Sequence, residues 1–307
     1  MQEFGIATLD AIAARILDAI AQGEPASPDA TMFLLRHYVT SERDDLREPL
    51  GTALAEALEA ASRDTSPLAR AAWLTLFVEA AAIADDERIL QSAGAIVDGL
   101  RADWPIDAAT AAGLIAAAAS VDACLRASSV FDPEVVPPAI DELERFIGGA
   151  YRPGEGLSFA RSRAEARASD ALAGARAFQA SDRDGRAEAD AEARTAHVSA
   201  SSALLTAFEV TGRLPYSMLA EELMQPVRRV FAAENLVLDC RSVRVLCRLA
   251  ALHDDTGYRA AAVLAPDADY RADAARILRA HASEALEAEV ADAALYGIAL
   301  RELISLR

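Results

Sequence analysis

The stretch AIADDERIL (residues 82–90) closes one apolar helical run with an acidic turn and begins a second, amphipathic run without a spacer. The same order recurs in SERDDLREPL (41–50), SVFDPEVV (129–136), EVTGRLPYSML (209–219) and ALHDDTGYRAA (251–261). The central turn residues are Asp45, Asp86, Asp132, Gly212 and Asp255. Successive turn residues are 41, 46, 80 and 43 positions apart, so the long step is close to two periods. A repeat of about forty residues with a central turn is typical of stacked helical hairpins, and the turns predict five of them.

Helical signals cover most of the 307-residue chain, whereas strand signals are nearly missing. Windows rich in Ala, Leu, Arg and Glu repeat their apolar residues at helical spacing, and no Asn-Gly hairpin interrupts them. Ser27-Pro28 and Ser66-Pro67 each place an N-cap hydroxyl before a proline. Proline is tolerated there because the first helical N–H has no partner within the helix. These patterns predict an all-α protein.

The two helices of a hairpin differ in polarity. Residues 110–125 (TAAGLIAAAASVDACL) are apolar on nearly every face, which predicts a helix enclosed by others. The helix that begins at Pro215 carries one apolar stripe, and we expect Glu221 and Glu222 to turn outward. Each repeat is therefore predicted to have an inner and an outer helix.

Two helices, at residues 7–22 and 286–305, lie outside the five hairpins. Both have an apolar face, whereas the end helices of an open repeat protein need polar outer faces. We therefore expect the first and last helices to pair as a sixth hairpin. This pairing predicts a closed (α/α)6 toroid in which residues 1–307 form one domain, and an open α-solenoid is the alternative.

Charge and composition exclude several classes of function. All 30 basic residues are arginine, and 48 acidic residues give a formal net charge of −18. Without lysine there is no Schiff base, pyridoxal phosphate anchor or P-loop lysine, and we expect no cofactor. Nucleic acid and anionic membranes are poor partners because each needs a basic patch. We expect neither a signal peptide nor a membrane span, and the three cysteines without a CxxC favour the cytoplasm.

Four segments resemble a known family of helical toroids. They are LERFIGGAYRPGEG (143–156), HVSASSALLTAFEVTGRLPYSMLAEEL (197–223), VRVLCRLAAL (243–252) and DADYRADAARIL (267–278). With the weaker LDAIAARILDAI (9–20) and LLRHYVTSERDDLRE (34–48), they look like the six-hairpin toroid that follows the thioredoxin-like domain of bacterial thioredoxin-domain proteins. The resemblance implies an (α/α)6 barrel, as in N-acylglucosamine 2-epimerase-like and six-hairpin glycosidase-like enzymes.

The chain departs from that family where the resemblance would place function. It has no CxxC, and we expect no thioredoxin-like domain ahead of the toroid. Ala196 and His197 stand where the family tends to have an Asp-Gln pair. SRDTSPLARAAW (62–73) and NLVLDCRS (235–242) replace two further family motifs. These departures favour a binding module over inherited catalysis.

Candidate catalytic residues follow from the expected toroid, in which the N-termini of the inner helices meet at one mouth and favour polar ligands. His197, expected at the start of an inner helix, is the candidate acid–base residue, and capping or packing is its alternative role. Glycoside hydrolysis needs two carboxylates, which Glu192 or Glu155 with Asp239 or Asp292 would supply. The many acids of this chain make coincidental pairs common.

Other side chains are candidates for ligand binding. Trp73, Trp104 and Tyr151 could stack on a sugar or pack in the core, while Arg194 and Arg241 would add cations at the mouth. We expect no metal site, because Cys240 and Cys247 share one helix face without further ligands. The acidic DDxxE pattern at residues 44–48 fits a helix cap better than a magnesium site. His281 is expected to be exposed.

The polar segment 152–194 contains no Ile, Val, Met or Trp and reads as an insertion, either a lid over the mouth or a passive loop. Two functions remain open. The first is a binding module that holds a small polar ligand, such as a carbohydrate, or a protein partner. The second is a carbohydrate-processing hydrolase or epimerase that uses His197 and carboxylates at the mouth.

Overall fold

The structure is a computed structural model that describes residues 2–25, 27–41, 43–159, 181–229, 235–262 and 264–306, with side chains except at 2–4 and 181–189. Within these ranges every regular element is helical apart from one antiparallel pair of strands, β1 (Tyr151–Arg152) and β2 (Gly156–Leu157). The all-α class is therefore confirmed. No helix in the described ranges is long and apolar enough to cross a membrane.

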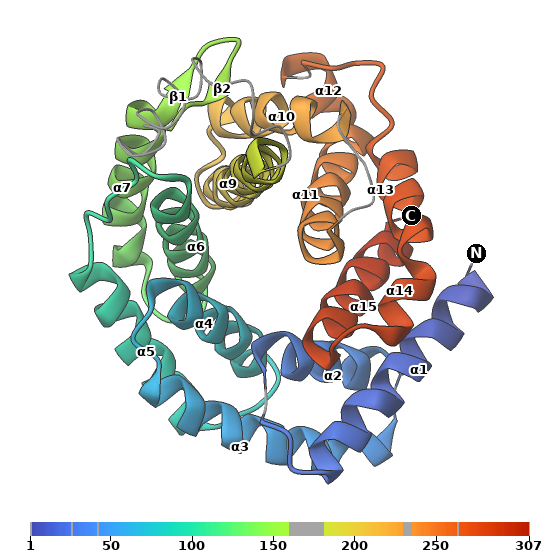
Figure 1. Ribbon diagram of the computed structural model, residues 1–307. Helices are drawn as coiled ribbons and strands as arrows, with labels where there is room; N and C mark the ends of the chain where they lie inside the picture. Colours follow the sequence, from blue (N-terminus) through green and yellow to red (C-terminus); the bar gives the residue numbers. More distant parts are fainter. Residues whose placement is uncertain are drawn as a thin grey trace.

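The helices form an inner and an outer layer (Figure 1). The inner helices are α2 (Pro28–Ser41), α4 (Pro67–Ala81), α6 (Ala111–Ala127), α9 (Ser181–Thr211), α11 (Leu236–Asp254) and α15 (Val290–Ser305). The outer helices are α1 (Gln2–Ala21), α3 (Arg47–Arg63), α5 (Glu87–Ala102), α7 (Val136–Ala150), α10 (Leu214–Arg229) and α13 (Tyr270–Ala280). Short connecting elements are the 3-10 turns Asp44–Leu46 and Pro133–Val135, α12 (Thr256–Ala262) and α14 (Ala282–Glu287).

Contacts between neighbouring helices follow the predicted pairing. Each inner helix contacts the next one in chain order, and α15 contacts α2. The helix α1 packs against α15, so the first and last helices of the chain lie side by side (Figure 1). These contacts support the closed six-hairpin toroid over the open solenoid, and closure itself stays a prediction.

The turns between paired helices are fixed by local side-chain chemistry. Asp86 caps α5 by accepting a hydrogen bond from the backbone N–H of Arg88 at 2.9 Å. Ser66 caps α4 in the same way, accepting from the N–H of Ala69 at 3.1 Å, with Pro67 at the first helical position. Gly212 has a φ of +69° between α9 and α10, a backbone conformation that glycine adopts without strain. The predicted turn residues thus lie at the observed turns.

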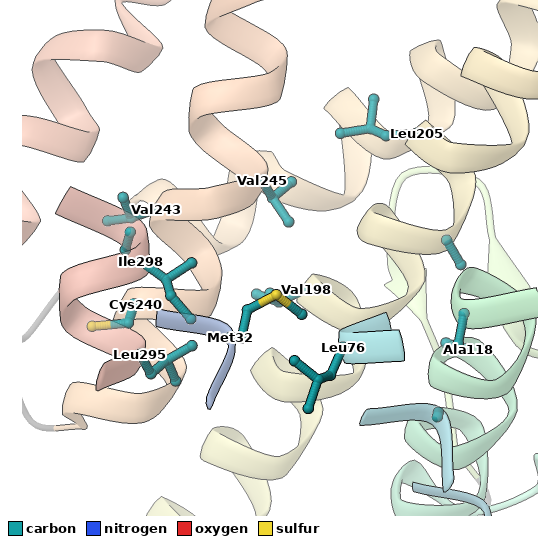
Figure 2. Packing of buried hydrophobic residues seen from close by; sticks show 14 of the residues in the cluster. Met32, Leu76, Ala118, Val198, Leu205, Cys240, Val243, Val245, Leu295 and Ile298 are labelled. Atoms are coloured by element: carbon teal, nitrogen blue, oxygen red, sulfur yellow. The ribbon is translucent and has the colours of Figure 1, made fainter. Parts of the chain in front are cut away.

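Small residues let the inner helices approach closely. Gly297 of α15 lies against the ring of Phe33 of α2, where an added Cβ would overlap the ring. On the other side of α15, Leu295 and Ile298 lie beside Cys240 and Val243 of α11 (Figure 2). The helix α15 is therefore held between α2 and α11, and Gly297 sets its distance from α2.

The prediction that Glu221 turns outward is wrong. Its side chain is fully buried, with 0 % exposure, and accepts hydrogen bonds from the backbone N–H groups of Leu264 and Ala265 at 2.9 and 3.1 Å. The hydroxyl of Tyr270 also donates to it at 2.7 Å. The loop before α13 covers this face of α10, and helical periodicity within α10 alone could not reveal that cover.

Two other predictions about position are also wrong. His281 is 1 % exposed rather than on the surface, because Asp239 and Glu284 enclose it. His197 lies well inside α9 rather than at its start, because the helix begins at Ser181, within the segment predicted as an insertion. The residues 182–195 are rich in Ala, Glu and Arg and contain no Pro, which allows the helix to extend. Residues 160–180 of the predicted insertion, and with them the choice between a lid and a passive loop, lie outside the described residues.

Candidate functional site

A cavity of about 420 Å³ lies between the inner helices, within the size range of small-molecule sites. Its lining residues come from all the inner helices and are Pro28, Asp29, Met32, Arg36, Leu68, Ala71, Ala72, Thr75, Ala119, Asp122, Arg126, Val198, Ser199, Ser202, Glu209, Arg241, Arg244, Val245, Arg248 and Glu302. Met32, Val198 and Val245 form part of its apolar wall (Figure 2). Five arginines and four acids line the rest, although the whole chain has a net charge of −18.

One part of the cavity is closed by an ion-pair cluster around Glu302 in the last turn of α15. Arg36 of α2 binds Glu302 at 2.6 Å and also holds Glu79 of α4 through two hydrogen bonds of 2.7 and 2.5 Å. Arg244 of α11 donates to Glu302 at 3.1 Å. Burial would raise the pKa of Glu302, but Arg244 and Arg36 outweigh burial and lower it. The Glu302 carboxylate is therefore held ionised between two guanidinium groups.

A second ion-pair cluster surrounds Asp122 of α6. Its carboxylate accepts hydrogen bonds from Arg126 at 3.1 Å, from Ser202 at 2.9 Å and from the hydroxyl of Thr206. Burial would raise the pKa of Asp122, but the nearby arginines and hydroxyl groups lower it. This carboxylate is also held ionised and has several partners.

Arg248 of α11 extends the second cluster to the end of α9. It donates to Glu209 at 3.1 Å and to the hydroxyl of Thr206 at 2.9 Å. We call the two clusters together the ion-paired half of the cavity, which comprises Arg36, Glu79, Asp122, Arg126, Glu209, Arg244, Arg248 and Glu302. Its arginines all have carboxylate partners.

The other part of the cavity, nearer the N-termini of α2 and α11, holds two charged side chains without such partners. Asp29 lies in the first turn of α2 and Arg241 in the second turn of α11. Among the described residues, neither side chain makes a hydrogen bond or ion pair, and we call these two residues the unpaired end. Burial raises the pKa of Asp29, although Arg244 and Arg241 are close enough to lower it in part. The Asp29 carboxyl therefore has an increased tendency to be protonated.

His197, the candidate acid–base residue, does not line the cavity. Its Nδ1 donates to the backbone carbonyl of Ala193 at 2.7 Å, and its Nε2 accepts from the N–H of Leu157 at 3.2 Å. Burial lowers the pKa of His197, so the imidazole is held neutral. Both ring nitrogens thus connect α9 to β2.

The four candidate carboxylates lie in different surroundings. Glu155 is exposed in the turn between β1 and β2. Glu192 is exposed on α9. Asp239 is buried and accepts a hydrogen bond from Nε2 of His281 at 2.7 Å. Asp292 lines a separate pocket with Asn235 and Glu284, although its charge raises the pKa of Asp29. The structure does not bring these four carboxylates and His197 together at one cavity.

The candidate aromatic residues make structural contacts. Trp73 is 3 % exposed and donates from Nε1 to Asp64 at 2.6 Å. Trp104 donates to Ser120 at 2.9 Å and lies in a shallow pocket among outer residues. Tyr151 donates to Glu222 at 2.8 Å. None of these three side chains lines the central cavity, which leaves no aromatic ring among its described lining residues.

Of the two candidate arginines, only Arg241 lies at the cavity. Arg194 donates to the carbonyl of Asp190 at 3.4 Å. Burial raises the pKa of Asp239, and the charges of His281 and Arg194 oppose that rise. Asp29 was not among the predicted site residues, although Ser27-Pro28-Asp29 opens an inner helix, where helix N-termini favour polar ligands. Acidic residues are common in the first turn of a helix. The position of Asp29 therefore did not by itself indicate a ligand site.

The cysteines and other ionisable groups offer little further chemistry. Cys124, Cys240 and Cys247 are buried and unpaired, and burial raises the pKa of Cys124 and of Cys247 to about 12. Neither thiol would be a thiolate at neutral pH. In the parts of the chain that the structure describes, no group of three or more His, Cys, Asp or Glu side chains could hold a metal ion.

Comparisons with known proteins identify no relative of this chain. A scan against protein-family models, a search of curated proteins and a search of solved structures each found no match.

Proposed function

We propose that the protein is a binding module that holds a small polar ligand in the cavity between its inner helices. The observation that carries the proposal is the contrast between Arg241, which has no partner among the described side chains, and four paired arginines at the same cavity. A half-buried guanidinium group without an ion-pair partner can form a charge-assisted, bidentate pair with a ligand that supplies a carboxylate.

The ion-paired half suits a supporting role. Its side chains are already locked in place by several hydrogen bonds each, so they would position the walls of the site without rearranging. The cavity volume of about 420 Å³ suits a small molecule better than a segment of a protein partner. The resemblance to six-hairpin toroids supports a carbohydrate-binding role, and the three cysteines are free rather than disulfide-bonded, as is usual in a reducing compartment.

A thermal-shift screen tests this proposal. Sugars, sugar phosphates and small organic acids are added to the whole protein, and any compound that raises Tm is then titrated by calorimetry. The variant Arg241→Gln should abolish the shift, whereas the matched control Arg259→Gln, which changes an exposed arginine of α12, should preserve it. A compound that shifts both variants and the wild type equally would contradict the proposed site.

A second candidate function is a carbohydrate-processing hydrolase or epimerase, and one observation favours it. The pKa of Asp29 is raised by burial, while the pKa of Glu302 at the same cavity is lowered by its arginines. Such opposed carboxyl groups are what acid–base catalysis on sugars requires. The partners of Glu302 occupy its oxygens, which makes binding the first choice.

The enzyme alternative has its own test. Reducing-sugar release and epimerisation of simple glycosides would be measured for the wild type and Asp29→Asn. Turnover that disappears in Asp29→Asn would establish the enzyme, whereas bound sugars that are never converted would leave the binding module.

A further inference from the structure

Among the described side chains that line the cavity, every arginine except Arg241 forms an ion pair. Arg36 and Arg244 share Glu302, with Glu79 as a second partner of Arg36. The remaining members of the ion-paired half form the pairs Arg126 with Asp122 and Arg248 with Glu209. Asp29 and Arg241 are left over, and within the described chain neither is bound to the other or to any third group.

Arg241 offers a specific kind of site. A guanidinium group presents parallel N–H donors that match the two oxygens of a carboxylate, and it remains charged at every physiological pH. It is half-buried in the second turn of α11, in a cavity whose neighbouring wall includes Met32 and Val245. Partial removal from water strengthens an ion pair formed there.

Asp29 offers a different kind of site. Burial raises the pKa of Asp29, and the charges of Arg244 and Arg241 oppose that rise. A carboxyl group accepts a hydrogen bond in either protonation state, and it therefore pairs well with a hydroxyl group. Ser199 and Thr75 add further hydroxyl groups to the lining.

We propose that the ligand of the central cavity is a small hydroxylated monocarboxylic acid, whose carboxylate binds Arg241 and whose hydroxyl group binds Asp29. The inference rests on the proposed binding function and names the chemical class of its ligand. A ligand carboxylate would give Arg241 the ion-pair partner that no described side chain supplies. A neutral sugar would leave Arg241 without a counter-charge, and a phosphate dianion would bring excess negative charge close to Asp29 and Asp292.

Isothermal titration calorimetry with a matched set of probes tests the ligand class. Gluconate carries a carboxylate and hydroxyl groups, sorbitol has the hydroxyl groups alone, hexanoate has the carboxylate alone, and glucose 6-phosphate carries a dianion. We expect gluconate to bind at least tenfold more tightly than each of the others, a difference of about 1.4 kcal/mol.

Two variants assign the contacts. Arg241→Gln should weaken gluconate binding at least tenfold and leave the weak binding of sorbitol unchanged. Asp29→Ala should reduce the advantage of gluconate over hexanoate. Because neither residue has a partner among the described side chains, both variants should fold, which far-ultraviolet circular dichroism checks. Arg259→Gln is the control and should bind all probes as the wild type does.

The outcomes distinguish an error in the ligand class from a failure of the proposed binding function. If sorbitol or glucose 6-phosphate binds as tightly as gluconate, and the binding depends on Arg241 or Asp29, the proposed ligand class is wrong. The proposed binding function would still stand. If hexanoate binds as tightly as gluconate, the hydroxyl group has no role in binding. If none of the four probes binds and the wider thermal-shift screen also yields nothing, the proposed function fails together with this inference.

Discussion

The two parts of the central cavity differ in how their charges are satisfied. In the ion-paired half, Glu302 is held by Arg36 at 2.6 Å and by Arg244 at 3.1 Å. At the unpaired end, Asp29 and Arg241 face the same cavity without a hydrogen bond to any described side chain. Acidic and arginine side chains are therefore paired with each other in one part of the cavity and unpaired in the other. The paired charges hold neighbouring inner helices together, and the unpaired charges mark the place where we propose that a ligand binds.

The largest effect is expected from Glu302→Ala, which breaks the ion-paired half. This substitution leaves Arg36 with one carboxylate partner, Glu79, and removes the carboxylate that pairs with Arg244. We expect the free energy of unfolding to fall by about 3 kcal/mol, as for removal of one member of a largely buried ion pair. Urea denaturation measures the change, with the exposed Glu287→Ala of α14 as a control that should alter it by less than about 0.5 kcal/mol.

The next effect concerns the contact between α2 and α15, on which both parts of the cavity depend. Gly297→Ala places a methyl group into the ring of Phe33, and we expect a loss of about 1–3 kcal/mol. Gly94→Ala in α5 is the matched control, since nothing lies near its Cβ position. That control should stabilise the protein by up to about 1 kcal/mol through helix propensity. Equal effects of the two substitutions would contradict the close approach of α15 to α2.

A smaller effect compares two arginines of the same helix directly. Arg244→Gln removes the hydrogen bonds to Glu302 and should cost about 1.5–3 kcal/mol. Arg241→Gln removes a cation without a partner in the described structure and should change the free energy of unfolding by less than about 0.5 kcal/mol. Denaturation by urea or guanidinium chloride, without ligand, measures the free energy of unfolding of both variants. A large loss in Arg241→Gln would show that the unpaired end is part of the structural network.

The smallest effect is a pair of opposite pH dependences at two histidines. Burial opposes the charge of His281, but hydrogen bonds with Asp239 and Glu284 raise its pKa, whereas burial lowers the pKa of His197. The stabilisation from His281 is therefore full below the unfolded pKa of about 6.5 and is lost as pH rises through the higher folded value. The stabilisation from neutral His197 is full above about 6.5 and is lost as pH falls through the lower folded value.

Urea denaturation between pH 5 and 8 checks these signs. The stability difference between wild type and His281→Gln should shrink as pH rises, and the difference for His197→Gln should shrink as pH falls. The same direction in both variants would contradict the surroundings described for one of the two histidines.

Local signals in the sequence account for much of the fold. Asp86 and Ser66 mark helix starts through contacts with residues two or three positions away, so the turns and the all-α class are readable from short segments. The burial of Glu221 depends on a loop 43 and 44 positions further along the chain. Periodicity within one helix cannot detect a partner at that distance.

The candidate site was less accessible from the sequence for the same reason. Arg36 is separated by 43 positions from Glu79 and by 266 from Glu302, so nothing local distinguishes it from the unpaired Arg241. Arg241 was a candidate because it lies near the start of an inner helix. Asp29 satisfied the same rule and was overlooked, and His197 was favoured because the start of α9 was expected too late in the chain.

Calorimetric titration of gluconate into the wild type and Arg241→Gln at the same pH and salt concentration tests the central claim most directly. The unpaired end predicts that the wild type binds and that the variant loses at least tenfold in affinity while its Tm without ligand stays unchanged. Equal affinity in the two proteins would contradict a ligand site at Arg241.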